Sequence, residues 1–169
     1  PFLITDDALA EAVAASDVAA RLLDSLSAAG AVGLTMWPED LRHPFSVMPD
    51  EPLLTPQDFA GKVMRGGPAN ITIEMLKTLG ASDVMLEDSG YQGAESGFLN
   101  GYTLMGKPTA TGNVTFYPKF EILFANAAAF AHLDADQQAV LRKTAAAAQA
   151  KDIAERPKEV DSAAAWCAD

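Results

Sequence analysis

The sequence predicts an α/β protein in which a mainly parallel or mixed sheet is flanked by helices. Segments with apolar residues at helical spacing alternate with short runs rich in β-branched and aromatic residues. Glycines stand at many of the junctions, where a helix has to end. The chain has 169 residues, of which 49% are apolar and 21% charged, so it can bury a core of ordinary size.

Helices followed by a strand are expected in the first part of the chain. The short polar side chains of residues 5–7 can accept the N–H groups of a first helical turn. Apolar residues continue on an Ala-rich background up to Gly30, which predicts one long helix or two in sequence. Residues 31–37 then predict a buried strand. Residues 38–56 combine prolines with charges and predict an irregular connection, with a short extended piece at 45–48.

The middle of the chain is expected to alternate between short strands and helices. A helical turn should begin at Pro56 and lead into a short apolar strand that ends at Arg65. Apolar residues at helical spacing predict a helix over 71–79, and a short strand over 82–86 should follow. Residues 91–98 predict a short helix.

The last part of the chain predicts one strand and several helices. Residues 114–125 are the most β-rich segment, and Pro118 within them favours an edge strand or a bend. Asn126 should begin a short helix, and Asp134 should cap a longer one in a capping box with Gln137. Pro157 should end or bend that helix, and another helical turn or two should follow.

These elements predict three segments. Residues 1–42 are expected to form part of a first lobe, with helix and strand. Residues 43–112 are expected to form a second lobe that contains the Arg65 strand, and residues 113–169 a return strand with C-terminal helices. In α/β sheets ligands gather beyond the carboxyl ends of the strands, which draws attention to Arg65.

Charge and composition argue against several partners. The net charge of −11 comes from 23 acidic and 12 basic residues without a Lys/Arg cluster, which argues against nucleic acid and against an anionic membrane surface. No apolar run approaches the roughly 18 residues that span a bilayer, so no membrane insertion of this chain is expected. The single cysteine, Cys167, rules out an internal disulfide. No signal peptide precedes Pro1, and the abrupt start predicts a fragment or a processed form.

No sequence pattern is typical of an active site, so we expect no enzyme and no cofactor. His43 and His132 are each isolated, and a structural or solvent role is expected for both. No histidine, cysteine or acidic pair has metal-ligand spacing, so no metal site is expected. Ser96 follows Glu95 rather than the Gly-x of a nucleophile elbow, and the Gly66–Gly67 pair lacks the rest of a phosphate-binding fingerprint.

Arg65 is the sharpest candidate for a binding residue. It ends an apolar strand and is followed by two glycines and a proline, so its guanidinium should lie at a strand tip where a ligand can approach. A planar fork of five donors suits a carboxylate, which it can bind bidentately. A lone arginine is more often a surface residue or one half of a weak salt bridge, and spacing alone leaves that alternative open.

Three further residues are weaker candidates for contact with a ligand. Arg42 lies in the charged, proline-rich segment, where simple solvation is the alternative. Asn100 precedes Gly101, a pair typical first of a turn. Tyr117 belongs to the β-rich segment, where aromatic residues more often fill a core or an edge than line a pocket.

Taken together, these segments resemble the substrate-binding proteins of TRAP-type (DctP-like) dicarboxylate transporters. TPQDFAGKVMRGGP (55–68) resembles a signature in which a P-x-D-x-x-G turn leads into a strand ending in a carboxylate-clamping arginine. LKTLGASDV (76–84) resembles the following helix–Gly-Ala–strand segment, and AESGFLNG (94–101) resembles a G-x-x-D-G turn. Residues 113–148 resemble the strand and helices that follow, and residues 1–30 resemble the segment that precedes, so the likeness covers nearly the whole chain in order.

The resemblance implies a periplasmic-binding-protein-like fold that closes around a small organic acid and delivers it to the membrane permease subunits of a transporter. It implies a periplasmic or extracellular location, with a lipid anchor of the full-length protein left open. Arg65 falls on the clamp position, Arg42 falls near a second arginine that can support the same carboxylate, and Asn100 falls where the family usually carries Asp. The family's N- and C-terminal portions are missing, which predicts a fragment. A ligand-sensing or interaction module on the same scaffold is the alternative.

Overall fold

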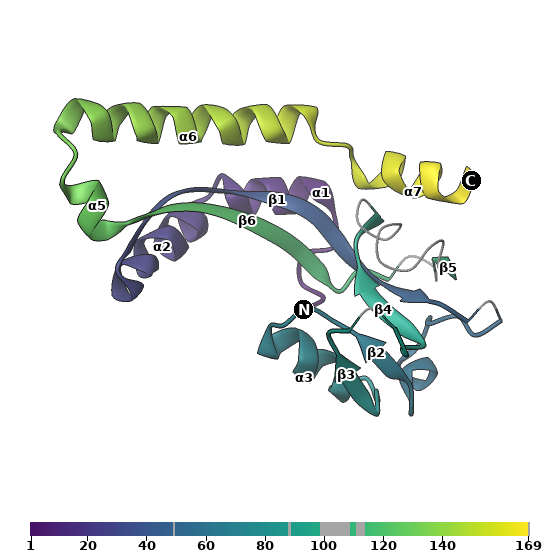
Figure 1. Cartoon of the computed structure of the whole chain (residues 1–169). Coiled ribbons are helices and arrows are strands. Elements are labelled where there is room, and N and C mark those ends of the chain that lie inside the picture. The colour runs from purple at the N-terminus through teal and green to yellow at the C-terminus, as the bar shows by residue number, and fades with distance from the viewer. Residues whose placement is uncertain (49, 88, 99–108, 111–113, 169) are drawn as a thin grey trace. The chain divides into compact units, whose positions relative to one another are not determined.

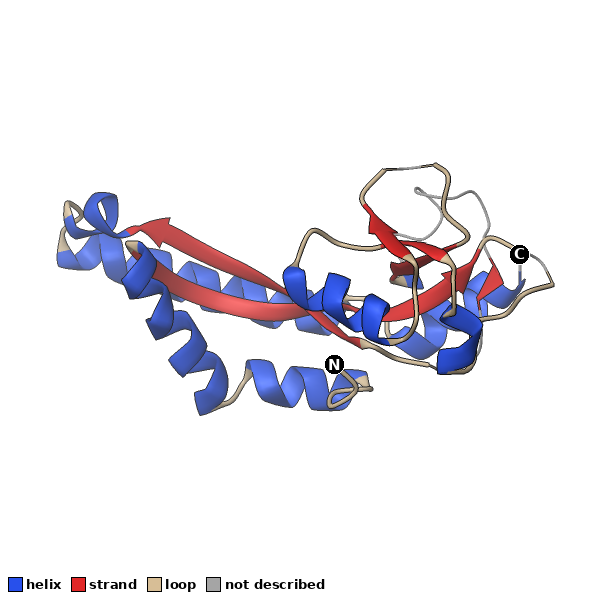
Figure 2. Ribbon diagram, turned by 90° about the horizontal axis from the view of Figure 1, so that it is seen from below, coloured by secondary structure: helices blue, strands red, loops and turns tan. Residues whose placement is uncertain are grey.

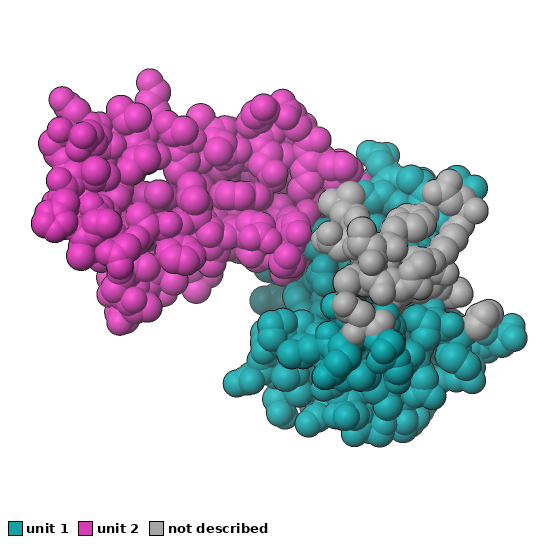
Figure 3. Space-filling view, in the orientation of Figure 1, with its two compact units in different colours: residues 1–5, 40–117, 159–169 teal, residues 6–39, 118–158 magenta. Residues whose placement is uncertain are grey.

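The chain folds into two compact units, which are described separately. The computed structural model describes residues 1–48, 50–87, 89–98, 109–110 and 114–168. Unit 1 comprises Pro1–Thr5, Asp40–Tyr117 and Glu159–Asp169, and unit 2 comprises Asp6–Glu39 and Pro118–Lys158 (Figure 3). The sequence-based segments, with their boundaries at 42 and 112, stay a prediction.

The described strands form one mixed sheet in the order β3-β2-β4-β1-β5, and β6 pairs with β1 (Figure 1). The strands are β1 (Ala31–Ser46), β2 (Val63–Arg65), β3 (Asp83–Met85), β4 (Gly93–Ser96), β5 (Thr109–Ala110) and β6 (Tyr117–Asn126). Strand β2 runs parallel to β3 and β4, whereas β1 is antiparallel to β4 and β5. The predicted α/β class with a mixed sheet is therefore confirmed.

Unit 1 has an apolar core between its strands and one helix. The helical turn η2 (Pro56–Phe59), strand β2 and helix α3 (Asn70–Thr78) follow one another as predicted, and α3 packs on β3 (Figure 2). A capping box between Thr55 and Asp58 starts η2. The buried core residues are Leu53, Phe59, Met64, Met75, Leu76, Ala81 and Phe116.

Aromatic rings hold helix α7 (Glu159–Ala168) against β1 within unit 1. The Trp166 ring lies 5.2 Å from that of Phe45 and 5.8 Å from that of Phe98, measured between centroids. His43 Nδ1 is hydrogen-bonded to Val114 O at 2.8 Å, and His43 Nε2 contacts a Glu159 carboxylate oxygen. These contacts give the buried His43 a structural role, as expected from the sequence.

Unit 2 contains most of the helical residues. Its helices are α1 (Asp7–Ala14), α2 (Asp17–Ser25), η1 (Leu26–Ala29), α5 (Ala127–Ala131) and α6 (Ala135–Glu155). The expected caps at Asp6, Asn126 and Asp134 are confirmed, and each side chain accepts a backbone N–H of the first helical turn. The segment before Gly30 forms two α-helices in sequence, so the second of the two alternatives is correct. No described helix has the length and apolarity required to cross a membrane.

The prediction of an irregular connection after Trp37 is wrong. Strand β1 continues through Pro38 and Pro44 to Ser46. Proline removes one N–H donor but prefers φ values that an extended chain can adopt. The residues on either side of Pro44 keep their partners, because His43 pairs with Ser96 and Phe45 with Ala94.

The prediction of a helix over 91–98 is also wrong, since these residues contain strand β4. Gly93 explains the change. A Cβ at this position would lie 2.8 Å from Leu53 Cδ1 and 2.9 Å from Met64 Sδ, so only glycine allows such close approach of β4 to the core. Pairing with both β1 and β2 then overrides the weak local preference of a four-residue segment.

Two adjacent leucines provide a test of the unit 1 core. Leu53 is fully buried, whereas the side chain of Leu54 is 52% exposed. Leu53→Ala should lower the free energy of unfolding by about 2–5 kcal/mol, because it removes packed methyl groups and leaves a cavity. Leu54→Ala should change it by less than about 0.5 kcal/mol. Urea denaturation of both variants measures the difference, and equal losses would contradict this packing.

Candidate functional site

Arg65 is the last residue of β2 and lies in the interior of the sheet. Its backbone pairs with Met85 of β3 on one side and with Ala94 of β4 on the other. The side chain is half-buried. Beyond it Gly66 N donates to Met85 O of β3 at 3.1 Å, and residues 68–69 lead into helix α3. The predicted short strand that ends at Arg65 is confirmed.

The second candidate arginine, Arg42, lies in a buried ion pair. It belongs to β1, its side chain is 12% exposed, and its partner Glu95 of β4 is 2% exposed. Arg42 Nε donates to Glu95 Oε1, and Arg42 Nη2 donates weakly to the Glu95 carbonyl oxygen at 3.5 Å. Arg42 Nη1 donates to Asp40 Oδ1 at 3.4 Å. The suggestion that Arg42 is solvated is therefore wrong, because each of its three nitrogens contacts a protein acceptor.

The surroundings of Arg42 keep it positively charged. Burial by itself lowers the pKa of the guanidinium. The negative charge of Glu95, the hydrogen bond to Glu95 and the charge of Asp40 together raise it by more, so the pKa lies above its ordinary value. A buried charge is tolerated when it is paired and hydrogen-bonded. The ion pair between Arg42 and Glu95 meets both conditions across 53 residues of sequence.

Asp40 is held close to the backbone after β4. It is buried, and a Cβ placed on Gly97 would lie 1.5 Å from Asp40 Oδ2. No side chain larger than hydrogen fits at position 97 while Asp40 keeps this position. The glycine therefore makes room for a second carboxyl group beside Arg42.

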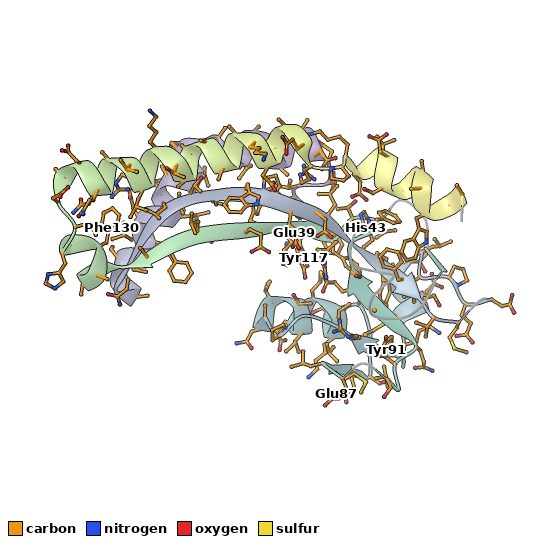
Figure 4. All side chains as sticks on the ribbon, turned by 45° about the horizontal axis from the view of Figure 1, so that its top comes forward. Glu39, His43, Glu87, Tyr91, Tyr117 and Phe130 are labelled. Carbon is orange, nitrogen blue, oxygen red and sulfur yellow. The ribbon has the colours of Figure 1, made fainter. Side chains whose placement is uncertain are left out.

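Tyr117 joins this cluster to helix α3. Its hydroxyl is hydrogen-bonded to Thr72 Oγ1 at 2.8 Å, and Figure 4 shows Tyr117 at the start of β6. Burial raises the pKa of Tyr117 to about 12, and the nearby negative charge of Glu95 acts in the same direction. The phenol therefore stays protonated at neutral pH. Tyr117 packs against the unit 1 core, in agreement with the core alternative stated for it above.

The segment after Arg65 approaches the same cluster. Gly67 N donates to Glu95 Oε2 at 3.4 Å, so the two carboxylate oxygens of Glu95 face Arg42 and the chain that follows β2. Arg65 pairs with Ala94 in the strand register, so both side chains point to the same face of the sheet. Glu95 follows Ala94 and points to the other face, because successive side chains alternate along a strand. The two arginines therefore approach the sheet from opposite faces.

The structure brings two of the four candidate residues together, and one candidate lies outside the described residues. Arg42 and Tyr117 belong to one polar cluster, and Arg65 lies on a neighbouring strand. Asn100 lies outside the described residues. Sequence reasoning missed the roles of Glu95 and Asp40. In the sequence, Glu95 is a single charged residue among the small residues of 93–97. This pattern indicates a buried acid only when its basic partner is known.

The described residues offer no other site with obvious chemistry. Within them, no group of three or more His, Cys, Asp or Glu residues is arranged to hold a metal ion. Cys167 is exposed on α7. The arrangement holds a buried ion pair between β1 and β4.

The fold is similar to that of several TRAP periplasmic solute-binding proteins with solved structures. A TRAP periplasmic solute-binding protein from Citrobacter koseri, solved with bound D-glucuronate, covers 99% of this chain with a TM-score of 0.78 and 20% identity. The relative from Pseudomonas aeruginosa PAO1, solved with bound L-malate, covers 92% with a TM-score of 0.76 and 19% identity. The relative from Xanthobacter autotrophicus Py2, solved with bound β-D-galacturonate, covers 89% with a TM-score of 0.73 and 22% identity. Likenesses at this identity establish the fold.

Family membership follows from the sequence match. The model for bacterial extracellular solute-binding proteins, family 7 (DctP), matches residues 1–86, just over half of the chain, and the chain belongs to this family. The resemblance seen in the sequence is confirmed. The chain spans between 53% and 60% of the length of these three solved relatives. No curated protein matches the chain.

The ion pair can be tested by removing one partner and then both. Arg42→Met leaves the Glu95 carboxylate buried without its guanidinium and should lower the free energy of unfolding by about 3–5 kcal/mol. The double variant Arg42→Met/Glu95→Met should recover part of that loss, because apolar side chains of similar volume replace both charges of the pair while the buried Asp40 carboxylate still loses its contact with Arg42. Urea denaturation measures both. Lys151→Met is the control, since it breaks an ion pair in which both side chains are about 70% exposed and should cost about 1 kcal/mol or less. A similarly small loss in Arg42→Met would contradict the pairing.

The raised pKa of Tyr117 predicts a loss of stability at alkaline pH. The folded protein holds the phenolic proton more tightly than the unfolded chain, because the folded pKa of about 12 exceeds the ordinary value of 10.0. This contribution is present in full below pH 10 and is lost as the pH rises through 12. Tyr117→Phe should cost about 1 kcal/mol at neutral pH, and the Tm gap between wild type and variant should narrow above pH 10. A gap that is independent of pH would contradict the shift.

Proposed function

We propose that this chain is part of an extracytoplasmic solute-binding protein that captures a small organic acid for a transporter, with Arg65 as the residue that binds the solute carboxylate. Family membership supports solute binding. The bound molecules of the solved relatives, D-glucuronate, L-malate and β-D-galacturonate, all carry carboxylate groups and support this solute class. The same relatives are periplasmic proteins of TRAP transporters, which supports a periplasmic location and membrane permease subunits as partners over a sensing module.

The position of Arg65 is the observation that carries the proposal. The guanidinium belongs to a short strand that is paired on both sides, so its backbone is fixed before any solute arrives. Rigid placement lowers the entropy lost on binding. Arginine offers two parallel N–H donors to a carboxylate, and a half-buried site weakens the competition from water. Tyr117 and Asn100 remain weaker proposals for solute contact.

Substitution of Arg65 tests the carboxylate-binding role. Arg65→Ala should weaken the binding of an organic acid by about 30-fold or more, because truncating one partner of a desolvated charge pair costs several kcal/mol. Arg65→Lys should weaken it less, since lysine keeps the charge and loses the planar fork. Calorimetric titration with D-glucuronate, L-malate and other small organic acids measures these affinities.

The matched control for loss of a positive charge is Lys77→Ala. Lys77 is exposed in the last turn of α3, in the same unit as Arg65. This variant should bind as tightly as the wild type. If Arg65→Ala binds the acid as tightly as Lys77→Ala does, Arg65 has no role in carboxylate binding.

A further inference from the structure

The contacts that hold helix α7 within unit 1 include one at each end of the helix. Glu159, its first residue, contacts His43 of β1. Trp166, in its last turn, is buried and packs on the rings of Phe45 and Phe98. Positions seven residues apart lie on the same face of an α-helix, two turns from each other. Glu159 and Trp166 therefore attach one face of α7 to β1.

The contact between His43 and Glu159 requires a proton. His43 Nδ1 is hydrogen-bonded to Val114 O at 2.8 Å, and a carbonyl oxygen can only accept, so Nδ1 carries a hydrogen. In a neutral imidazole, Nε2 is then a bare acceptor. Nε2 contacts Glu159 Oε1, and an ionised carboxylate is an acceptor as well. Either Nε2 or Oε1 therefore has to carry a further proton while the two atoms are in contact.

The two contacting atoms are shielded from water. The side chains of His43 and Glu159 are 6% and 21% exposed, and both Nε2 of the histidine and Oε1 of the glutamate are buried. Without the proton, two lone pairs would face each other, and a buried carboxylate would lose its charge partner, which is strongly unfavourable. Separation of α7 from β1 returns both groups to water. Loss of the proton therefore favours separation.

The other charged or titratable groups on the neighbouring elements of unit 1 point away from this contact. Those of β1 and β4 lie on the opposite face of the sheet from His43, because successive side chains alternate along a strand. Those of α7 are exposed. In chain order these groups are Asp40, Arg42, Glu95, Asp161 and Cys167. Among the described residues of unit 1, the titratable group in contact with His43 is therefore Glu159.

From these contacts we infer that the docking of α7 on β1 is linked to pH through the proton shared by His43 and Glu159, so that the helix is held at mildly acidic pH and released as the pH rises. The docked state binds the additional proton, so it is stabilised as the pH falls and loses that stabilisation as the pH rises. Histidine is the side chain whose charge changes between about pH 5 and 8. This conformational device goes beyond the proposed function and does not depend on it.

The fluorescence of Trp166 reports the docking of α7 directly. The chain has two tryptophans, so Trp37→Phe leaves Trp166 as the source of tryptophan emission. As the pH is raised from about 5 to 9, this emission should shift to longer wavelength and its quenching by acrylamide should increase, because the ring leaves Phe45 and enters water. The titration leaves both members of the pair in place. Emission and quenching that stay constant over this range would overturn the inference.

Glu159→Gln, in the same Trp37→Phe background, removes the need for the proton. The amide nitrogen of the glutamine can donate to the bare Nε2 of a neutral His43, so α7 should stay docked from about pH 5 to 9. Asp161→Asn is the matched control, since it removes the same charge from an exposed position of the same helix. This control should keep the pH dependence. An unchanged pH dependence in Glu159→Gln would assign the effect to another group and overturn the inference.

Amide hydrogen exchange distinguishes the release of one helix from general unfolding. After correction for the intrinsic effect of pH on exchange, protection of α7 should fall as the pH rises, while protection of β2, which is paired on both sides, should persist. In Glu159→Gln, protection of α7 should persist as well. Equal loss of protection in α7 and β2 would show that unit 1 unfolds as a whole, which would overturn the inference.

Discussion

The buried ion pair between Arg42 and Glu95 is the interaction on which unit 1 depends. It joins β1 to β4, and its carboxylate also accepts an N–H from Gly67 in the segment that follows β2. A guanidinium out of water is costly, and only a carboxylate with good geometry offsets that cost. The pair therefore favours β1 and β4 as neighbours, because separating these strands would remove the partner of each charge. Tyr117 and Thr72 extend the same network to α3.

The sequence was sufficient to predict the elements that depend on contacts between residues close together in the chain. Caps such as Asp134, the helical turn at Pro56 and the strand that ends at Arg65 all follow from side chains within a few residues. It failed where distant contacts decide the outcome. Strand β1 passes through two prolines because strands remote in sequence supply its partners. Strand β4 forms because Gly93 lets it approach the core closely. Neither the remote strand partners of β1 nor the close approach of β4 to the core can be recognised from a few consecutive residues.

The candidate site divides in the same way. Arg65 could be found from the sequence, since an arginine after an apolar strand and before two glycines has a local meaning. Glu95 could not, because its importance comes from a partner on β1 and not from its neighbours. The family likeness implies a place near a ligand for Arg42, which stays a prediction, and the contacts show that its guanidinium pairs with Glu95 and Asp40.

Under the proposed function, two chemically identical side chains have different roles at different places on the sheet. Arg42 lies within a long strand between buried acids, so its charge is neutralised by the fold itself. Arg65 ends a short strand that is paired on both sides, and its side chain is half-buried. An arginine that stabilises the fold must have its acid supplied by the protein, whereas one that binds a solute should leave room for an acid from outside. Under the proposed function the solute supplies an acid to Arg65, whereas Glu95 and Asp40 supply the acids to Arg42.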